Sequence, residues 1–292
     1  MSVVAGIMVP HPPLIIPEVG KGGERQIALT SEMYERAAEF VRDMRPETIV
    51  LSSPHSVMYS DYLHISPGRA AKGDMASFGA EEVRMEVDYD EGFSKKLAEL
   101  ADKNDLPAGS DGERNPALDH GTMVPLYFIL RKYKDFKLVR LGISGISFED
   151  HYRLGRLVQK AADELGRRVL YVASGDLSHK LKDYGPYGYD KAGPVYDEKI
   201  MDVMGSADFG ELLNFDKRLC DDAAECGHRS FIIMAGAFDG KRIDARRLSH
   251  EDITGVGYGI CTFEVTGDDP ERVLTKTYRS GKGEAYGYKY DE

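Results

Sequence analysis

The chain has 292 residues, of which 42% are hydrophobic and 30% charged, a composition typical of a globular protein with a large buried core. Its formal net charge is −11 and it has no long run of Lys or Arg, which argues against a nucleic-acid-binding surface, because phosphate binding needs clustered basic residues. Apolar segments stay well short of the roughly 18 residues of a membrane-spanning helix, and the N-terminus lacks the pattern of a signal peptide, so we expect a cytoplasmic protein that does not bind membranes.

Apolar runs of strand length alternate with segments of helical periodicity along the chain. The predicted strands cover 3–9, 48–53, 61–68, 81–89, 137–144, 168–174, 246–251 and 257–265. The predicted helices cover 27–44, 90–104, 121–133, 149–165, 196–204, 209–215 and 227–238. Strands that are apolar throughout are typical of a sheet covered by helices on both faces. We therefore predict an α/β fold, a three-layer α/β/α sandwich with a mixed, largely buried central sheet.

The end of the chain differs in composition from the rest. Residues 268–292 are rich in Gly, Tyr and charged residues and lack periodicity, which is typical of an extended tail or the beginning of a linker. We therefore predict one domain over residues 1–267. The three cysteines, Cys220, Cys226 and Cys261, fit neither a disulfide framework nor a cysteine-rich zinc knuckle, and we expect Cys220 and Cys261 to pack in the core.

Four of the eight histidines fall at predicted element ends. His11, between prolines in "MVPHPPLI", follows the first strand; His55 and His179 follow two other strands; His120 precedes an apolar helix. Loops beyond the carboxyl ends of strands converge at one edge of an α/β sheet, so these side chains can meet there. Histidines in strand or helix surroundings are interpreted as structural: His64, His151 and His250.

Two histidines and one carboxylate would form the facial arrangement that is typical of non-haem Fe(II) sites. The segment "DDAAECGHRS" at 221–230 offers acidic residues, although such residues also stabilise a helix N-terminus through the helix dipole. Glu225 and Cys226 are neighbours and would point about 100° apart on a helix, so only one of them is expected to face a metal. Asp176 could orient His179, or it could cap its own turn.

Five segments together resemble the LigB-type, class III extradiol ring-cleavage dioxygenases. They are "VPHPP", "SSPHS", "DHGTMVPL", "SGDLSH" and "ECGHRSFIIMAGAF", and they occur in the family's order between about residues 5 and 265. The chain is most similar to the LigB-like domain that precedes an AMMECR-type domain, and more distantly to Memo proteins. The resemblance implies that an AMMECR-type domain could follow in the full-length protein.

The resemblance also implies roles for individual residues. His11 and His55 match the two histidine ligands of the metal. Glu225 matches the third ligand, with Cys226 as the alternative, because Memo-like proteins place a cysteine there. His179 matches the acid–base residue, and His120 matches a histidine that lines the substrate pocket. Fe(II) is the implied metal and Zn²⁺ the alternative, with a small aromatic diol and O₂ as substrates.

Three functions therefore stay open. The first is an extradiol-type dioxygenase acting on a catechol or related diol; the second is a Memo-like metal-binding or signalling module without ring cleavage. The third is a Zn²⁺-dependent hydrolase that uses the same histidines. A glutamate facing the metal would favour the first, and a cysteine the second. Members of the family often pair, so a homo-oligomer is expected, although no segment identifies an interface.

Overall fold

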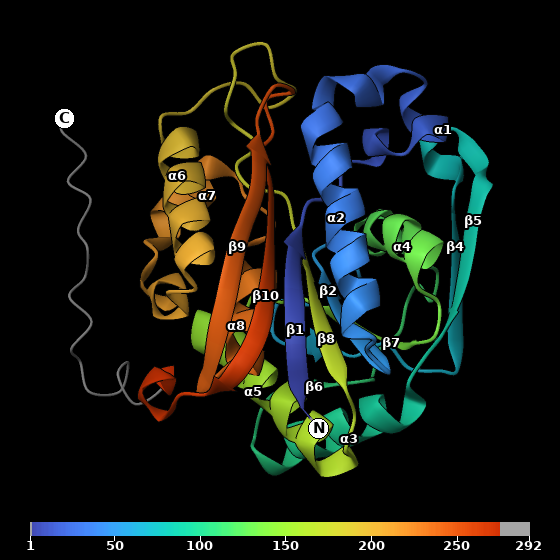
Figure 1. Cartoon of the computed structure of the whole chain (residues 1–292), viewed down its shortest axis with the longest axis vertical. Coiled ribbons are helices and arrows are strands. Elements are labelled where there is room, and N and C mark those ends of the chain that lie inside the picture. The colour runs from blue at the N-terminus through green and yellow to red at the C-terminus, as the bar shows by residue number, and fades with distance from the viewer. Residues whose placement is uncertain (1, 275–292) are drawn as a thin grey trace.

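Six strands form the central sheet of the computed structural model, which describes residues 2–274 (Figure 1). They are β1 (Val3–Val9), β2 (Thr48–Ser53), β7 (Lys137–Gly142), β8 (Val169–Ser174), β9 (Lys241–Glu251) and β10 (Tyr258–Asp268). Their order across the sheet is β7-β2-β8-β1-β10-β9. The first four are parallel to one another, whereas β10 runs antiparallel to both β1 and β9. The predicted mixed sheet is confirmed.

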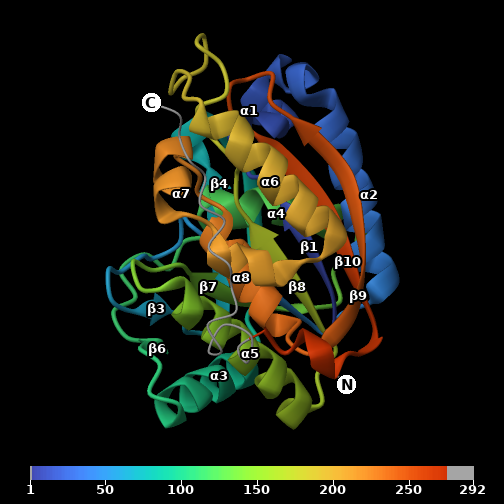
Figure 2. The same cartoon turned by 90° about the vertical axis from the view of Figure 1, so that its left-hand side faces the viewer.

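Helices cover both faces of this sheet, as predicted (Figures 1 and 2). The eight α-helices of the described residues are α1 (Pro17–Gly20), α2 (Ala28–Met44), α3 (Glu91–Lys103), α4 (His120–Lys132), α5 (Phe148–Leu165), α6 (Ala192–Ser206), α7 (Lys217–Ala223) and α8 (His228–Ala237). Alternate residues of the parallel strands point to opposite sides. In β8, for example, Leu170 and Val172 pack with α2 and α4, whereas Tyr171 and Ala173 pack with α5 and α8. This arrangement explains why the central strands are apolar throughout.

Two smaller sheets lie outside the central one. β4 (Ala70–Met75) and β5 (Ala80–Asp88) form an antiparallel hairpin, and β3 (Leu63–His64) pairs with β6 (Ala108–Gly109) in parallel. The strand predicted over 61–68 is thus reduced to two residues.

Other predicted elements differ from the structure in type or length, and the helix predicted over 196–204 is the longer α6. The predicted helix 209–215 is the 3-10 helix Phe209–Asn214, and β9 is longer than the predicted 246–251. β9 lies at the edge of the sheet, where alternating exposed charges weaken the apolar signal of a strand. Of the predicted tail, residues 275–292 lie outside the described residues, so the domain boundary at 267 stays a prediction.

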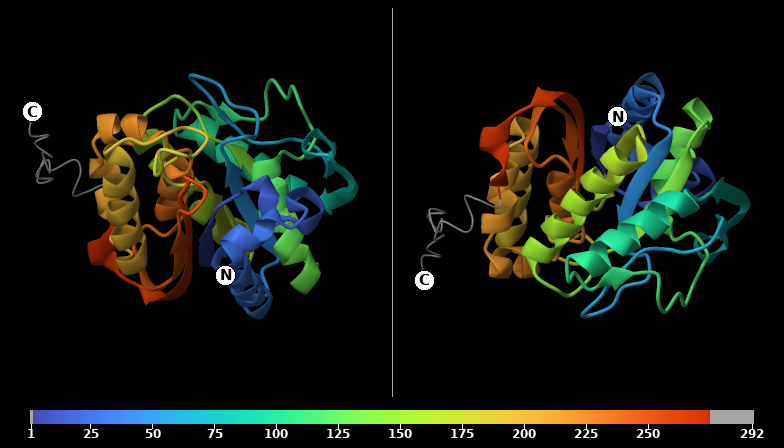
Figure 3. Two further views of the ribbon diagram at one scale, coloured as in Figure 1. Left: turned by 90° about the horizontal axis from the view of Figure 1, so that it is seen from above. Right: turned by 90° about the horizontal axis from the view of Figure 1, so that it is seen from below.

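The parallel pairing brings the carboxyl ends of β1, β2 and β8 to one edge of the sheet, which faces the viewer in the left panel of Figure 3. The loops that carry His11, His55 and His179 leave from this edge. No α-helix in the described part of the chain is long and apolar enough to span a bilayer.

Two histidines are fully buried in the α5–α8 layer. The Nε2 atom of His151 accepts the backbone N–H of Ser144 at 3.2 Å, so its Nδ1–H donates to the carbonyl of Ser147 at 2.8 Å. The Nε2 atom of His228 lies 2.9 Å from the carbonyl oxygen of Leu212. Burial lowers the pKa of His151 to about 4 and the pKa of His228 to about 3. The structural interpretation of His151 agrees with these bonds.

These two histidines predict that the protein loses stability in mild acid. Their pKa values are lower in the folded than in the unfolded chain, so the unfolded state binds more protons below about pH 6.5. The free energy of unfolding should therefore decrease by up to about 1.4 kcal/mol per pH unit for each histidine as the pH falls toward about 4. Urea denaturation at several pH values measures this dependence, and His151→Gln should make it shallower. An equally steep dependence in wild type and variant would contradict the prediction.

Candidate metal centre

His11 is held rigidly in the loop that follows β1. Its ring is 2% exposed, and its backbone N–H donates to Oδ1 of Asp176 at 2.7 Å. The carbonyl of the preceding Pro10 accepts a hydrogen bond from the hydroxyl of the buried Tyr34. Flanking prolines restrict the backbone on both sides. The loop therefore fixes the position of the imidazole before any ligand binds.

Three of the predicted histidines lie together. The Nε2 atoms of His11 and His55 are 3.0 Å apart. The ring of His120, the first residue of α4, lies 3.9 Å from that of His55 and 5.5 Å from that of His11, centroid to centroid. Gly121 permits this approach, because a Cβ at that position would collide with the hydroxyl of Ser53. The fourth histidine, His179, lies nearby beside Asp176.

Cys226 lies next to His11 and His55, where it could serve as the third metal ligand. Its Sγ lies 3.6 Å from Nε2 of His11. The carboxylate of Glu225 instead accepts the backbone N–H of His228 at 2.6 Å, where it caps the start of α8. The structure thus brings the alternative, Cys226, and not the preferred Glu225, to the histidines, because the glutamate is used as a helix cap.

Backbone packing holds this cysteine in place. Gly175 and Gly227 touch so closely that a Cβ on Gly175 would collide with the Cα of Gly227. The backbone N–H of Cys226 also reaches the carbonyl of Asp176, 3.4 Å away. The segment after β8 and the segment before α8 are therefore fixed against each other, although some fifty residues separate them in the sequence.

The donor atoms of His11, His55 and Cys226 fit one metal ion. All three lie within 4.8 Å of one another. In a tetrahedral site with metal–nitrogen bonds of about 2.0–2.1 Å and metal–sulfur bonds of about 2.3 Å, two nitrogens are separated by about 3.3 Å and nitrogen and sulfur by about 3.5 Å. The observed 3.0 and 3.6 Å are close to these separations. Two imidazoles and a thiolate suit iron or zinc.

A family model described as the catalytic LigB subunit of aromatic ring-opening dioxygenase matches residues 5–261. The chain belongs to the LigB family. This assignment agrees with the resemblance seen in the motifs around the four histidines.

Several known proteins are similar to this LigB-family chain. A Clostridium acetobutylicum protein named only by its locus is 35% identical over 99% of the chain, which spans 64% of that protein's length. The 2-aminophenol 1,6-dioxygenase beta subunit of a Pseudomonas species is 22% identical, over 94% of the chain and 98% of its own length. A MEMO1 family protein of Thermococcus onnurineus is 26% identical, over 76% of the chain and 77% of its own length.

A solved structure supports the fold alone. The crystal structure of an uncharacterized protein of Escherichia coli K12 superposes with a TM-score of 0.56 at 17% identity, and covers 89% of this chain and 99% of that one.

Asp176 links two of the histidines of the LigB-family site. Besides bonding the backbone of His11, it places Oδ2 4.0 Å from Nε2 of His11 and 3.9 Å from Nε2 of His179. Burial raises the pKa of Asp176 to about 6, which leaves it ionised at neutral pH. The sequence suggests Asp176 as a partner of His179 or as a turn cap, but it does not indicate the hydrogen bond to His11. Asp176, His179 and Cys226 form a second group close enough to hold a cation.

The environment keeps the imidazoles of this site neutral. Burial is the largest cause in each case and lowers the pKa of His11, His55 and His179, and it lowers that of His120 to about 3. Neutral imidazole is the form that binds metals. Burial also raises the pKa of the Cys226 thiol, so a bound cation would be needed to hold it as a thiolate.

An open cavity of about 280 Å³ adjoins His55 and is lined by Met58, Arg114 and Asp119, among others. Its wall contains Arg140, which is 1% exposed and donates from Nη1 to the carbonyl of Ala117 at 2.6 Å. Sequence reasoning did not single out Arg140. A charged residue inside the otherwise apolar run "KLVRLGIS" was the signal that could have identified it.

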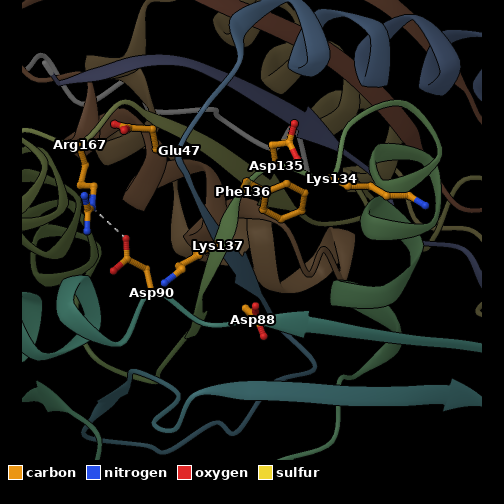
Figure 4. A pocket seen from close by; sticks show the side chains of 8 residues that line it. All are labelled: Glu47, Asp88, Asp90, Lys134, Asp135, Phe136, Lys137 and Arg167. Carbon is orange, nitrogen blue, oxygen red and sulfur yellow. Dashed lines mark hydrogen bonds and ion pairs between the residues drawn. The ribbon is translucent and has the colours of Figure 1, made fainter.

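A second cavity lies away from this site. It has a volume of about 450 Å³ and lies at the opposite edge of the sheet. Figure 4 shows the side chains that line it, which include Glu47, Lys137 and the ion pair of Arg167 with Asp90, whose charged atoms are 3.3 Å apart. Glu47 and Lys137 stand at the amino ends of β2 and β7, and none of the predicted site residues lines this space. The metal centre, and not this cavity, is therefore the candidate functional site.

The positions of Cys226 and Glu225 predict that substitution of the first weakens metal binding and substitution of the second lowers stability. Cys226→Ala should weaken Zn²⁺ binding more than about tenfold, because a donor atom is lost. Glu225→Ala should leave Zn²⁺ affinity within about threefold but lower the free energy of unfolding by about 1 kcal/mol, because a helix cap is lost. Competition with a chromophoric chelator measures the first quantity, and urea denaturation the second. The reverse pattern of metal affinities would show that Glu225 is the ligand.

Proposed function

We propose that this LigB-family chain is a metal-dependent dioxygenase that opens the ring of a small aromatic substrate, a catechol or a related compound with two adjacent donor groups, using O₂. One observation carries the proposal. His120 and His179 lie beside the group formed by His11, His55 and Cys226 although a metal would not need them as ligands. Two further neutral imidazoles beside a metal can hydrogen-bond a substrate and take up its proton, which ring-opening chemistry needs.

The comparisons support the same class of chemistry. The family description is of a ring-opening dioxygenase subunit, and the Pseudomonas relative, which aligns over nearly the whole chain, is named for dioxygenation of 2-aminophenol. Fe(II) is the metal that we propose, with Zn²⁺ as the alternative. His11, His55 and Cys226 would hold it. When bound, Fe(II) would bring the two donor groups of the substrate and O₂ together and allow electron transfer between them.

His179 is proposed as the acid–base residue. Its lowered pKa leaves the imidazole neutral at physiological pH, so it can accept a proton from a substrate hydroxyl. The carboxylate of Asp176, 3.9 Å from Nε2, would stabilise the imidazolium that forms. His179 can then return the proton to the product as it forms. The backbone N–H of His179, which donates to the carbonyl of Ala223 at 3.1 Å, keeps the ring near the site.

His120 is proposed to bind the substrate rather than the metal. Burial and the neighbouring histidines keep its imidazole neutral, so it can both donate and accept a hydrogen bond. It stands at the first position of α4, whose N-cap Asp119 fixes the start of the helix by accepting the N–H of Thr122 at 3.0 Å. A ring held in this way can orient a substrate oxygen.

A Memo-like metal-binding module without ring cleavage is the second candidate. The observation that favours it is Cys226, because a cysteine beside the two histidines is the arrangement that the resemblance implies for Memo proteins. The MEMO1 family relative supports it as well. A homo-oligomer and a C-terminal AMMECR-type domain stay predictions for either function.

Oxygen uptake by anaerobically purified, Fe(II)-reconstituted protein tests the proposal. With a panel of catechols and 2-aminophenols, wild type should consume O₂ and form a coloured ring-opened product. His179→Ala should reduce the rate by about 10²- to 10⁴-fold, the contribution of general acid–base catalysis, while it keeps its metal. His11→Ala and His55→Ala should lose both the metal and the activity but stay folded.

Three outcomes separate the functions. Stoichiometric metal without O₂ uptake on any of these compounds would contradict the dioxygenase and favour the Memo-like module. Ester or amide hydrolysis by the Zn²⁺-loaded protein would favour the hydrolase. Full metal occupancy in both His11→Ala and His55→Ala would contradict the site itself.

A further inference from the structure

A buried serine connects His11 to the start of α4. Ser174, the last residue of β8, is 0% exposed. Its Oγ lies 3.0 Å from Nδ1 of His11 and 2.5 Å from the carbonyl oxygen of Gly121, the second residue of α4. The hydroxyl thus stands between a ring nitrogen of a candidate ligand and the backbone of a helix.

The direction of both hydrogen bonds follows from chemistry alone. A carbonyl oxygen can only accept, and a serine hydroxyl has one hydrogen, so Ser174 donates to Gly121. The Oγ atom can then only accept from His11, and Nδ1 must carry the ring hydrogen. A neutral imidazole has a single N–H, which leaves Nε2 of His11 with a free lone pair. That lone pair is on the atom that lies 3.0 Å from Nε2 of His55 and 3.6 Å from Sγ of Cys226.

We propose that Ser174 is a positioning residue that fixes the Nδ1–H tautomer of His11 and so presents the Nε2 lone pair to a metal ion. The inference rests on the metal-binding part of the proposed function and adds the residue that prepares the ligand. Without the serine, His11 could place its hydrogen on Nε2, the tautomer that cannot bind through this atom.

Ser53 offers a matched control, because it makes the same kind of link without touching a ring. It is the last residue of β2, the strand next to β8, and it is buried. Its Oγ donates to Oδ1 of Asp119, the N-cap of α4, at 2.5 Å, and accepts the backbone N–H of His55 at 3.1 Å. Both serines therefore join a strand end to the start of α4, but only Ser174 bonds an imidazole nitrogen.

The tautomer can be measured without metal or substrate. Long-range ¹H–¹⁵N NMR of the metal-free, ¹⁵N-histidine-labelled chain distinguishes a protonated from an unprotonated ring nitrogen, and His11→Gln assigns the signals. Wild type and Ser53→Ala should show His11 protonated at Nδ1. Ser174→Ala should show His11 partly or wholly protonated at Nε2.

Zn²⁺ affinity gives the second readout. Ser174→Ala should bind Zn²⁺ about 10- to 100-fold more weakly than wild type, the usual effect of removing a hydrogen-bond partner of a metal-binding histidine. Ser53→Ala should stay within about threefold, and Ser174→Thr, which keeps a hydroxyl, should recover most of the affinity.

Two results would overturn the inference. One is a wild-type His11 protonated at Nε2, a result that does not depend on whether Ser174→Ala folds. The other is an equal loss of Zn²⁺ affinity in Ser174→Ala and Ser53→Ala, which would indicate a purely structural role. Failure of O₂ uptake would contradict the proposed dioxygenase but would leave the tautomer and Zn²⁺ results unchanged, so the two failures are distinguishable.

Discussion

The parallel pairing of β1, β8 and β2 is the constraint on which the site depends. Strands that run in the same direction end at the same edge of a sheet, and their loops share the space beyond it. The chain uses this property to bring together His11, His55 and His179, which are separated by more than forty residues at each step. α4 completes the edge, because its first residue is His120 and its N-cap and first turn bond to the ends of both β2 and β8. The geometry of the site is therefore a property of the whole sheet and of one helix start, and the loops add little freedom.

Burial also determines the protonation states of the residues in this site. Because the imidazoles are removed from water, their pKa values are lowered and they stay neutral, as metal binding requires. Burial acts on the Cys226 thiol in the opposite sense and raises its pKa, so the thiolate form depends on a cation. Without a metal these residues are therefore expected to be uncharged, and metal binding would release the thiol proton. Close contact between Gly175 and Gly227 makes the burial possible, since any side chain there would force the two segments apart.

Much of this architecture could be predicted from the sequence, and the failures have physical causes. Continuous apolar runs identified the central strands, because strands buried on both faces have no polar side. The histidines could be grouped because the carboxyl ends of parallel strands converge. The preference for Glu225 over Cys226 does not match the positions of the two side chains, because the carboxylate of Glu225 bonds the start of α8, a local hydrogen bond that residue spacing does not determine. The hydrogen bonds of Ser53 and Ser174 could not be predicted either, because a serine at a strand end has many possible partners.

A thiolate in place of a carboxylate changes little in the charge balance of the proposed site, and this bears on whether Cys226 excludes oxygenase chemistry. Each is a single negative charge, so a divalent metal held by His11, His55 and Cys226 would keep one positive charge for a substrate that has lost one proton. The proton taken by His179 would create a second positive charge, and Asp176, ionised at neutral pH and 3.9 Å away, would compensate it. A carboxylate is thus present beside the proposed site, but as Asp176, which accepts the backbone N–H of His11 and lies 3.9 Å from Nε2 of His179, the proposed acid–base residue. The difference between the two candidate functions then lies less in the number of charges than in the softer character of sulfur, which alters how readily the bound metal gives up electrons.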